Sequence, residues 1–161
     1  MYRTLLASTL LALTTGTLAL ADPQMVKKVE VVVDATAIDN AKAAAHWLAL
    51  ASDLNAAIVL RLGNQMADNG ARVLIDLSHV ELANTWQTTF GIAESRLVGD
   101  VIVRNADSDV EMRRYELTVS FADAGPFFPK GADMAALTSD SPEYYQAMVN
   151  AFADRVVTNL N

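Results

Sequence analysis

Apolar residues recur with two different periods along this chain, and the order of those periods constrains the fold more than any other feature. Four segments alternate between apolar and polar residues, which predicts strands with one buried face. Two segments follow the helical period of about 3.6 residues, one between the first and second strands and one at the C-terminal end. The predicted order is therefore β-α-β-β-β-α, in a single α+β domain.

The alternation also predicts which side of each strand faces the core. The turn-forming run from Asn105 to Asp109 separates the third and fourth strands and predicts a long antiparallel hairpin. The residues expected on the inner face are Val29, Val31 and Val33; Val73, Ile75 and Leu77; Leu97, Gly99, Val101 and Val103; and Tyr115, Leu117, Val119 and Phe121.

The first helical segment is predicted to run without interruption over residues 40–69, with Gly70 as its C-terminal stop and Gly63 as a point where it could bend. Leu50 and Leu60 are expected on its polar side. Its expected buried face comprises Trp47, Leu48, Ala51, Leu54, Ile58, Leu62 and Met66. Its expected polar face includes Lys42, His46, Asp53, Arg61, Asn64 and Asp68.

The last helix is expected to begin at Ser141-Pro142, because serine caps helix N-termini and proline suits the first turn. Its apolar stripe comprises Tyr145, Met148, Val149, Phe152, Val156 and Leu160. Each helix has one apolar face, so we expect a four-stranded mixed sheet with two amphipathic helices on one face. A helical connection between the first two strands favours a parallel pairing.

The N-terminal 21 residues are typical of a secretory signal peptide. A single positive charge at Arg3 precedes an uncharged apolar run, and Ala19-Leu20-Ala21 has small residues where signal peptidase cleaves. An uncleaved N-terminal anchor is the alternative, although the apolar run is short for a membrane span. We therefore expect a signal peptide over 1–21, a single exported domain over 22–161, and a periplasmic protein without a stable membrane anchor.

Charge and cysteine content narrow the classes of function. The chain has a net charge of −7, and cleavage would remove one arginine and no acidic residue, leaving −8. Such a surface lacks the basic footprint that nucleic-acid binding needs. The chain has no cysteine, which excludes disulfides, thiolate catalysis, cysteine metal sites and lipid attachment at a cysteine after the signal.

The run Leu97-Val98-Gly99-Asp100-Val101 leads into the long hairpin, and the closing helix contains Phe152-Ala153 and Val156. With the order of the elements and the long first helix, these features resemble a loose group of bacterial envelope proteins. The group includes curli-secretion-channel-like domains and the auxiliary lipoproteins of ABC-type lipid transporters. The resemblance implies an accessory or assembly role in the envelope, and it transfers no functional residues.

Few residues suggest catalysis. His46 is expected on the helix surface, and Asp76-Leu77-Ser78-His79 contains the residue types of a serine hydrolase triad. Regular alternation would place Ser78 and His79 on opposite faces of the strand, which argues against such a site. The sequence thus predicts no enzyme, no catalytic residue and no cofactor.

The hairpin carries carboxylates that allow two interpretations. Asn105, Asp107, Asp109 and Glu111 offer oxygen ligands at alternate positions, as a weak calcium loop would, but an EF-hand loop needs a glycine that is missing. A polar turn is the simpler interpretation, so no metal site is predicted. The mixed charges of Glu111, Arg113, Arg114 and Glu116 are interpreted as a charged strand face that discourages edge-to-edge pairing.

Phe127 and Phe128 lie in a Gly/Pro-rich loop and are the candidate partner contact. Adjacent aromatic residues in such a loop either pack against the core or form a contact patch. The favoured hypothesis is a non-enzymatic accessory or interaction protein of the envelope, with another envelope protein as partner. The alternative is a small-ligand or lipid-binding module that uses an apolar groove between sheet and helices; a hydrolase is the third.

Overall fold

The computed structural model describes residues 23–33, 47–81, 95–133, 136–138 and 141–161. Its elements follow the predicted order β-α-β-β-β-α. The predicted signal peptide, His46 and the connection at 82–94 lie outside the described residues. The strands are β1 (Val26–Val33), β2 (Ala71–Glu81), β3 (Arg96–Arg104) and β4 (Glu111–Ser120); the helices are α2 (Leu50–Leu62) and α4 (Pro142–Leu160), with short 3-10 turns η2 (Gly63–Gln65) and η3 (Gly125–Phe127).

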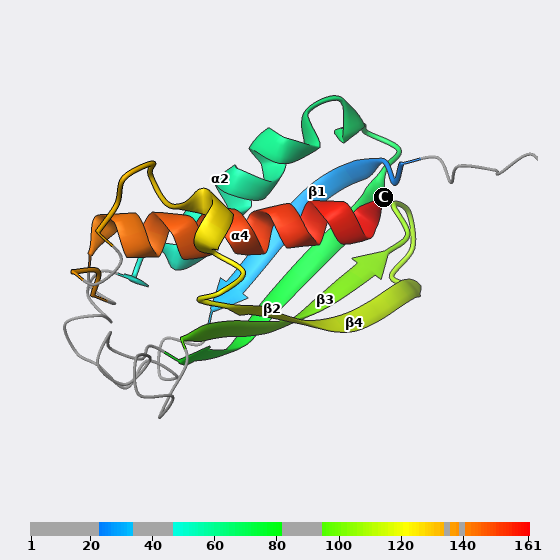
Figure 1. Ribbon diagram of the computed structural model, residues 1–161. Coiled ribbons are helices and arrows are strands. Elements are labelled where there is room, and N and C mark those ends of the chain that lie inside the picture. The colour runs from blue at the N-terminus through cyan, green and yellow to red at the C-terminus, as the bar shows by residue number, and fades with distance from the viewer. Residues whose placement is uncertain (1–22, 34–46, 82–94, 134–135, 139–140) are drawn as a thin grey trace, which may run out of the picture.

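The four strands form one mixed sheet in the order β1-β2-β3-β4. β1 pairs parallel with β2, as the helical connection between them predicts, and the other two pairings are antiparallel. Figure 1 shows α2 and α4 on the same side of this sheet. The predicted fold class is therefore confirmed, and the opposite face of the sheet is free of described helices.

The core lies between the sheet and the helices. The predicted inner residues of the strands meet the apolar stripes of both helices in one cluster. Phe152 is completely buried at the middle of α4, and Trp47 is 1% exposed just before α2. Ser141 caps α4 by accepting a hydrogen bond from the Tyr144 backbone, so the predicted start of this helix is confirmed.

The first helix is shorter than predicted. Gly63 has a φ of 49°, a conformation that favours glycine, and α2 ends there. The chain then turns back to the sheet, where Met66 forms a bridge with Val26 and the Ala67 N–H donates to the Val26 carbonyl at 2.9 Å. The prediction of a helix extending to residue 69 was wrong, because pairing with β1 replaces the last turns.

Gly70 is therefore not a helix stop. It lies where the chain enters β2 against β1, and a Cβ atom added to it would come within 2.5 Å of the Val26 backbone. Glycine is needed here for the close approach of two chain segments. The sequence identified an important glycine, but the structural reason is different.

The buried face of the first helix was also slightly misplaced. Leu50 is fully buried, whereas Leu48, expected in the core, is 76% exposed. Residues 48 and 49 form a turn before α2. The buried positions therefore follow the helical period only from Leu50 onwards. Leu60 is 80% exposed, as its predicted place on the polar side requires.

Candidate functional site

The loop with the candidate contact residues folds against the start of α4. The ring of Phe128 lies 5.4 Å from that of Phe121 and 6.4 Å from that of Tyr144, and Phe121 stacks on Tyr144 with centroids 5.3 Å apart. Phe128 is therefore part of an aromatic cluster at the rim of the core. Both Phe127 and Phe128 are partly buried and contact the core cluster.

Phe127 also lines a surface cavity of about 490 Å³, which we call the Phe127 hollow. The residues around it come from the loop that follows β4 and from α4: Ala122, Asp123, Pro126, Phe127, Ala151, Asp154, Arg155 and Thr158. The hollow thus combines one aromatic ring with charged groups of both signs. That composition differs from that of a pocket for an apolar ligand, which is lined mostly by hydrophobic side chains.

Asp123 is held firmly at the wall of the Phe127 hollow. Its carboxylate accepts hydrogen bonds from the Ser120 N–H at 2.9 Å and from the Ser120 hydroxyl at 2.7 Å. Arg155 of α4 pairs with the other carboxylate oxygen at 3.0 Å. The hydrogen bonds from Ser120, assisted by Arg155, lower the pKa of Asp123 below its usual value. The Asp123 carboxylate therefore stays ionised to a lower pH than an unperturbed aspartate.

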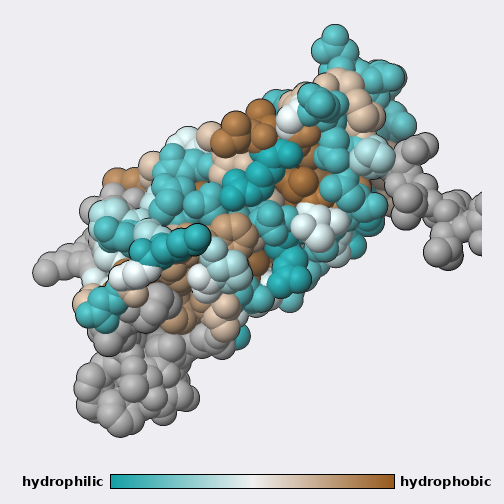
Figure 2. Space-filling model, turned by 45° about the horizontal axis from the view of Figure 1, so that its top comes forward, coloured by the Kyte–Doolittle hydropathy of each residue, from teal (hydrophilic) through white to brown (hydrophobic). Residues whose placement is uncertain are grey.

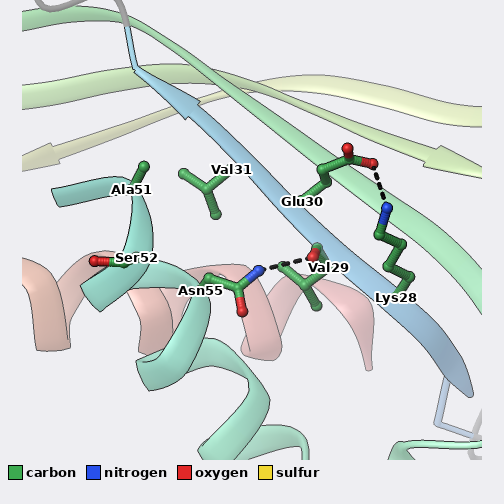
Figure 3. Close-up of a pocket in the computed structure, with 7 residues that line it drawn as sticks. All are labelled: Lys28, Val29, Glu30, Val31, Ala51, Ser52 and Asn55. Carbon is green, nitrogen blue, oxygen red and sulfur yellow. Dashed lines mark hydrogen bonds and ion pairs between the residues drawn. The ribbon is translucent and has the colours of Figure 1, made fainter. Parts of the chain in front are cut away.

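A second cavity, of about 440 Å³, lies beside the edge strand β1 and is called the β1 hollow (Figure 3). Asn55 of α2 reaches across it and donates a hydrogen bond to the Val29 carbonyl at 2.7 Å. Ser52, at the same wall, donates to the Ala49 carbonyl of its own segment at 2.7 Å. Asn55 attaches the helix to the strand, so we assign the β1 hollow a structural role.

Ser78 and His79 lie closer together than regular alternation predicted. The pairing of β2 with β3 shifts register between Leu77 and His79, and this bulge leaves both Ser78 and His79 exposed. The Ser78 hydroxyl lies 3.2 Å from Nδ1 of His79. The argument that these two side chains could not meet was wrong. Within the described part of the chain, however, no carboxylate is hydrogen-bonded to His79, so the orienting member of a triad is not assembled.

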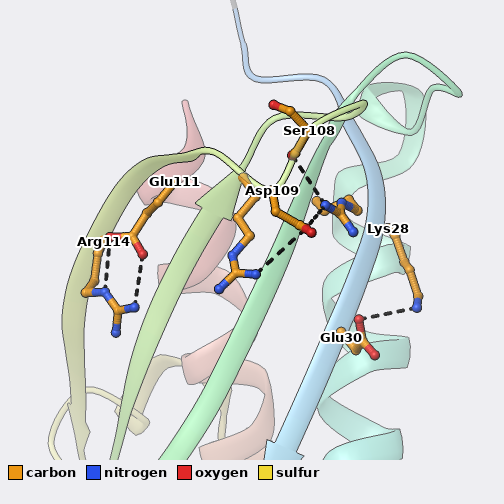
Figure 4. Close-up of polar contacts among 8 residues, drawn as sticks. Lys28, Glu30, Ser108, Asp109, Glu111 and Arg114 are labelled. Atoms are coloured by element: carbon orange, nitrogen blue, oxygen red, sulfur yellow. Dashed lines mark hydrogen bonds and ion pairs between the residues drawn. The ribbon is translucent and has the colours of Figure 1, made fainter.

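At the hairpin turn, arginines engage two of the four candidate calcium ligands (Figure 4). Asp109 forms ion pairs with Arg72 and, at 3.9 Å, with Arg104. Glu111 accepts hydrogen bonds from Arg114 at 3.0 and 3.1 Å, and these bonds lower the pKa of the Glu111 carboxyl. Asn105 Oδ1 instead accepts the Asp107 N–H at 3.0 Å, which closes the turn. The geometry is that of a polar hairpin turn braced by arginines.

A partly buried polar contact between the two helices was not predicted. Asp53, expected on the solvent side of its helix, accepts a hydrogen bond of 2.5 Å from the Tyr145 hydroxyl of α4. Burial, with a contribution from this bond, raises the pKa of Tyr145 above its usual value. No sequence signal could have found the pair, because its members are 92 positions apart on different helices.

Neither a membrane-spanning helix nor a cluster of metal ligands is found among the described residues. No helix there is both long enough and apolar enough to cross a membrane. The same residues contain no group of three or more histidine, aspartate or glutamate side chains arranged to hold a metal ion. On the face drawn in Figure 2, hydrophobic residues form separate patches divided by hydrophilic ones.

Comparison with known proteins leaves the family open. No protein family matches the chain, and no curated protein matches its sequence. A solved structure described as a "putative lipoprotein" of Caulobacter crescentus is similar over 82% of this chain and 86% of its own, with 16% sequence identity and a TM-score of 0.35. Similarity at that level supports no conclusion about fold or function.

Proposed function

We propose that the protein is an exported, non-enzymatic accessory or interaction protein of the bacterial envelope, and that it works by binding another envelope protein. The observation that carries this proposal is the filled space between sheet and helices. Leu54, Ile58 and Phe152, which project into that space, are all completely buried. Because these side chains occupy the space between the layers, we place the function on the surface of the domain.

The same observation weighs against the alternative, a small-ligand or lipid-binding module with an apolar groove between the layers. Pockets for apolar ligands are concave and lined mostly by hydrophobic side chains. The two cavities described above lie at the surface, and charged or polar side chains form much of their walls. Native mass spectrometry of protein recovered from the periplasm tests the alternative directly, since a bound lipid would add a discrete mass.

Within the proposed function, Phe127 is the stronger contact residue and Phe128 has the larger structural role. Phe127 borders the Phe127 hollow, whereas Phe128 packs against the stacked rings of Phe121 and Tyr144. Prolines at positions 126 and 129 restrict the backbone around both, which lowers the entropy cost of ordering the loop on binding.

Site-specific photo-crosslinking in intact cells tests the interaction. A photoreactive phenylalanine derivative at position 127 should capture one discrete protein, because it keeps the aromatic ring at the proposed interface. The same group at position 60, which is 80% exposed on α2, is the matched control. A crosslink pattern identical at the two positions, or none at position 127, contradicts the assignment of this surface.

Export is tested separately. The proposal expects a mature chain that starts at Asp22 and is recovered from the periplasm without detergent. Intact-mass measurement of the periplasmic protein decides this, and retention of residues 1–21 would contradict it.

A further inference from the structure

β4 has one edge that no described residue pairs with. It is the last strand of the sheet, and β3 pairs with it on one side only. Figure 1 shows this strand along the border of the sheet, beyond which no other labelled element lies. The N–H and C=O groups along such an edge form a template for pairing with another strand.

Apolar side chains accompany this edge at the start of the strand. Val110 is 64% exposed and Met112 is 54% exposed, although both are large hydrophobic residues. They lie next to each other on the surface-exposed end of the hairpin, where contact with another chain would remove them from water.

Two opposite charges flank the middle of the strand. Arg114 and Glu116 lie on either side of Tyr115, and their register partners on β3, Ile102 and Asp100, belong to the sheet face away from the helices. Arg114 pairs with Glu111 of its own strand and lies 3.9 Å from Asp100. Glu116 faces the like charge of Asp100 across the strands, and it forms no ion pair within the described residues.

We propose that β4 pairs antiparallel with β4 of a second copy of this chain, about a two-fold axis at Tyr115. In this register Arg114 of each copy lies directly opposite Glu116 of the other. Both copies keep their helices on the same side, and the two sheets join into one. Each Glu116 thereby gains the cationic partner that the described residues of its own chain do not supply.

The charges select this register over its neighbours. A shift that centres the pairing on Arg114 places two arginines opposite each other, and one that centres it on Glu116 places two glutamates opposite each other. Directly opposed like charges destabilise a strand pair. Sliding one strand by an odd number of residues relative to the other would place the helix-covered face of one chain beside the open face of the other. A two-fold axis perpendicular to the sheet does not allow that arrangement. The charges therefore favour the register centred on Tyr115 over the two adjacent symmetric registers.

The apolar side chains fit the same arrangement. With Tyr115 at the axis, Met112 of one copy lies opposite Thr118 of the other, and Val110 lies opposite Ser120. The exposed end of each hairpin is then covered by the second half of the partner strand. Because the contact is isologous, every favourable pair occurs twice.

Single cysteines test the register, since the natural chain has none. In the Tyr115→Cys variant, the two Cα atoms across the axis would be about 4.5–5.5 Å apart, which is within the range for a disulfide. Mild oxidation should therefore link the variant into a covalent dimer. In the matched Thr118→Cys variant the two cysteines would be about 20 Å apart along the paired strands, so it should stay unlinked.

Tyr115 is partly buried, so a second experiment avoids replacing it. An equimolar mixture of the Arg114→Cys and Glu116→Cys variants should form disulfide-linked heterodimers, and neither variant should link to itself. Both replaced side chains are exposed, and neither belongs to the core.

Charge reversal tests the energetics by sedimentation equilibrium. Glu116→Arg should weaken dimerisation about tenfold, because two cross-strand pairs become repulsive. Adding Arg114→Glu should restore most of the affinity. Glu30→Arg, a reversal of an exposed charge on the far edge strand, is the control and should leave dimerisation unchanged. A chain that stays monomeric at all concentrations, a dimer that tolerates Glu116→Arg, or equal crosslinking at positions 115 and 118 would each overturn the proposal.

Discussion

The hydroxyl of Tyr145 in α4 donates a hydrogen bond to the Asp53 carboxylate in α2, with 2.5 Å between the two oxygens. The Tyr145 ring also meets the edge of Trp47, with centroids 4.9 Å apart. Tyr145 therefore makes both a polar and an aromatic contact with the region around the start of α2. Since α2 and α4 pack together over the sheet, this contact helps to set their relative position.

Tyr145→Phe should lower the free energy of unfolding by about 1–2 kcal/mol, because a partly buried carboxylate loses its donor while the ring remains. Urea denaturation followed by circular dichroism measures the change. Asp53→Asn in the Tyr145→Phe background is the comparison, since it removes the uncompensated charge and should recover part of the loss. An unchanged midpoint in Tyr145→Phe would show that the bond contributes nothing.

The stability of the protein should fall in alkaline solution. The folded-state pKa values of Tyr145 and Tyr115 are both raised, in each case chiefly by burial. The folded protein therefore retains the hydroxyl protons of these two tyrosines to higher pH than the unfolded chain, whose tyrosines titrate at about pH 10. The associated stability is fully present below pH 10 and decreases as the pH rises above it. Denaturation midpoints measured across this range should decline less steeply in Tyr145→Phe than in the natural protein.

Phe152→Ala should destabilise the protein by about 3–5 kcal/mol, since its ring is completely buried among core side chains. Leu60→Ala is the matched control, because Leu60 is 80% exposed on α2, and its effect should stay within about 0.5 kcal/mol. Thermal and urea melts of both variants provide the comparison. Similar losses in the two would contradict the placement of the core.

The two phenylalanines of the candidate contact should differ in their effect on stability. Phe128→Ser should lower the melting temperature clearly, because its ring packs against Phe121 and Tyr144. Phe127→Ser should lower it less and should abolish recovery of the partner in an envelope pull-down, since its ring borders the Phe127 hollow. If Phe127→Ser costs as much stability as Phe128→Ser, the contact hypothesis loses its support.

Gly70→Ala should be strongly destabilising, by about 2–3 kcal/mol, because the new methyl group would collide with the backbone of β1. Gly125→Ala is the control: no atom lies within 4 Å of the added Cβ, and the glycine lies in a surface turn. Chemical denaturation of both variants checks the difference. Equal stability of the two variants would mean that the segment at Gly70 can move away from β1 without a loss of stability.

The candidate site was only partly predictable from the sequence. Phe127 and Phe128 were recognisable because aromatic residues in a Gly/Pro loop are unusual, but their division into a rim residue and a packed residue depends on Phe121 and Tyr144. The approach of Ser78 to His79 depends on a bulge in β2, and strand alternation read from sequence contains no signal for one extra residue. Glu116 stood out only as one of several charges until its place at the sheet edge was known.

The sequence by itself determined the class and order of the elements, the inner residues of the strands and the Ser141 cap of α4. Each of these depends on neighbours within a few positions, where period and local hydrogen bonding dominate. Tertiary structure alone decided that α2 ends at Gly63, that Gly70 makes room for β1, and that Asp53 meets Tyr145. In each case a segment far away in sequence supplies the contact, and the free energy of that contact overrides the local preference for a longer helix or a solvent-exposed carboxylate.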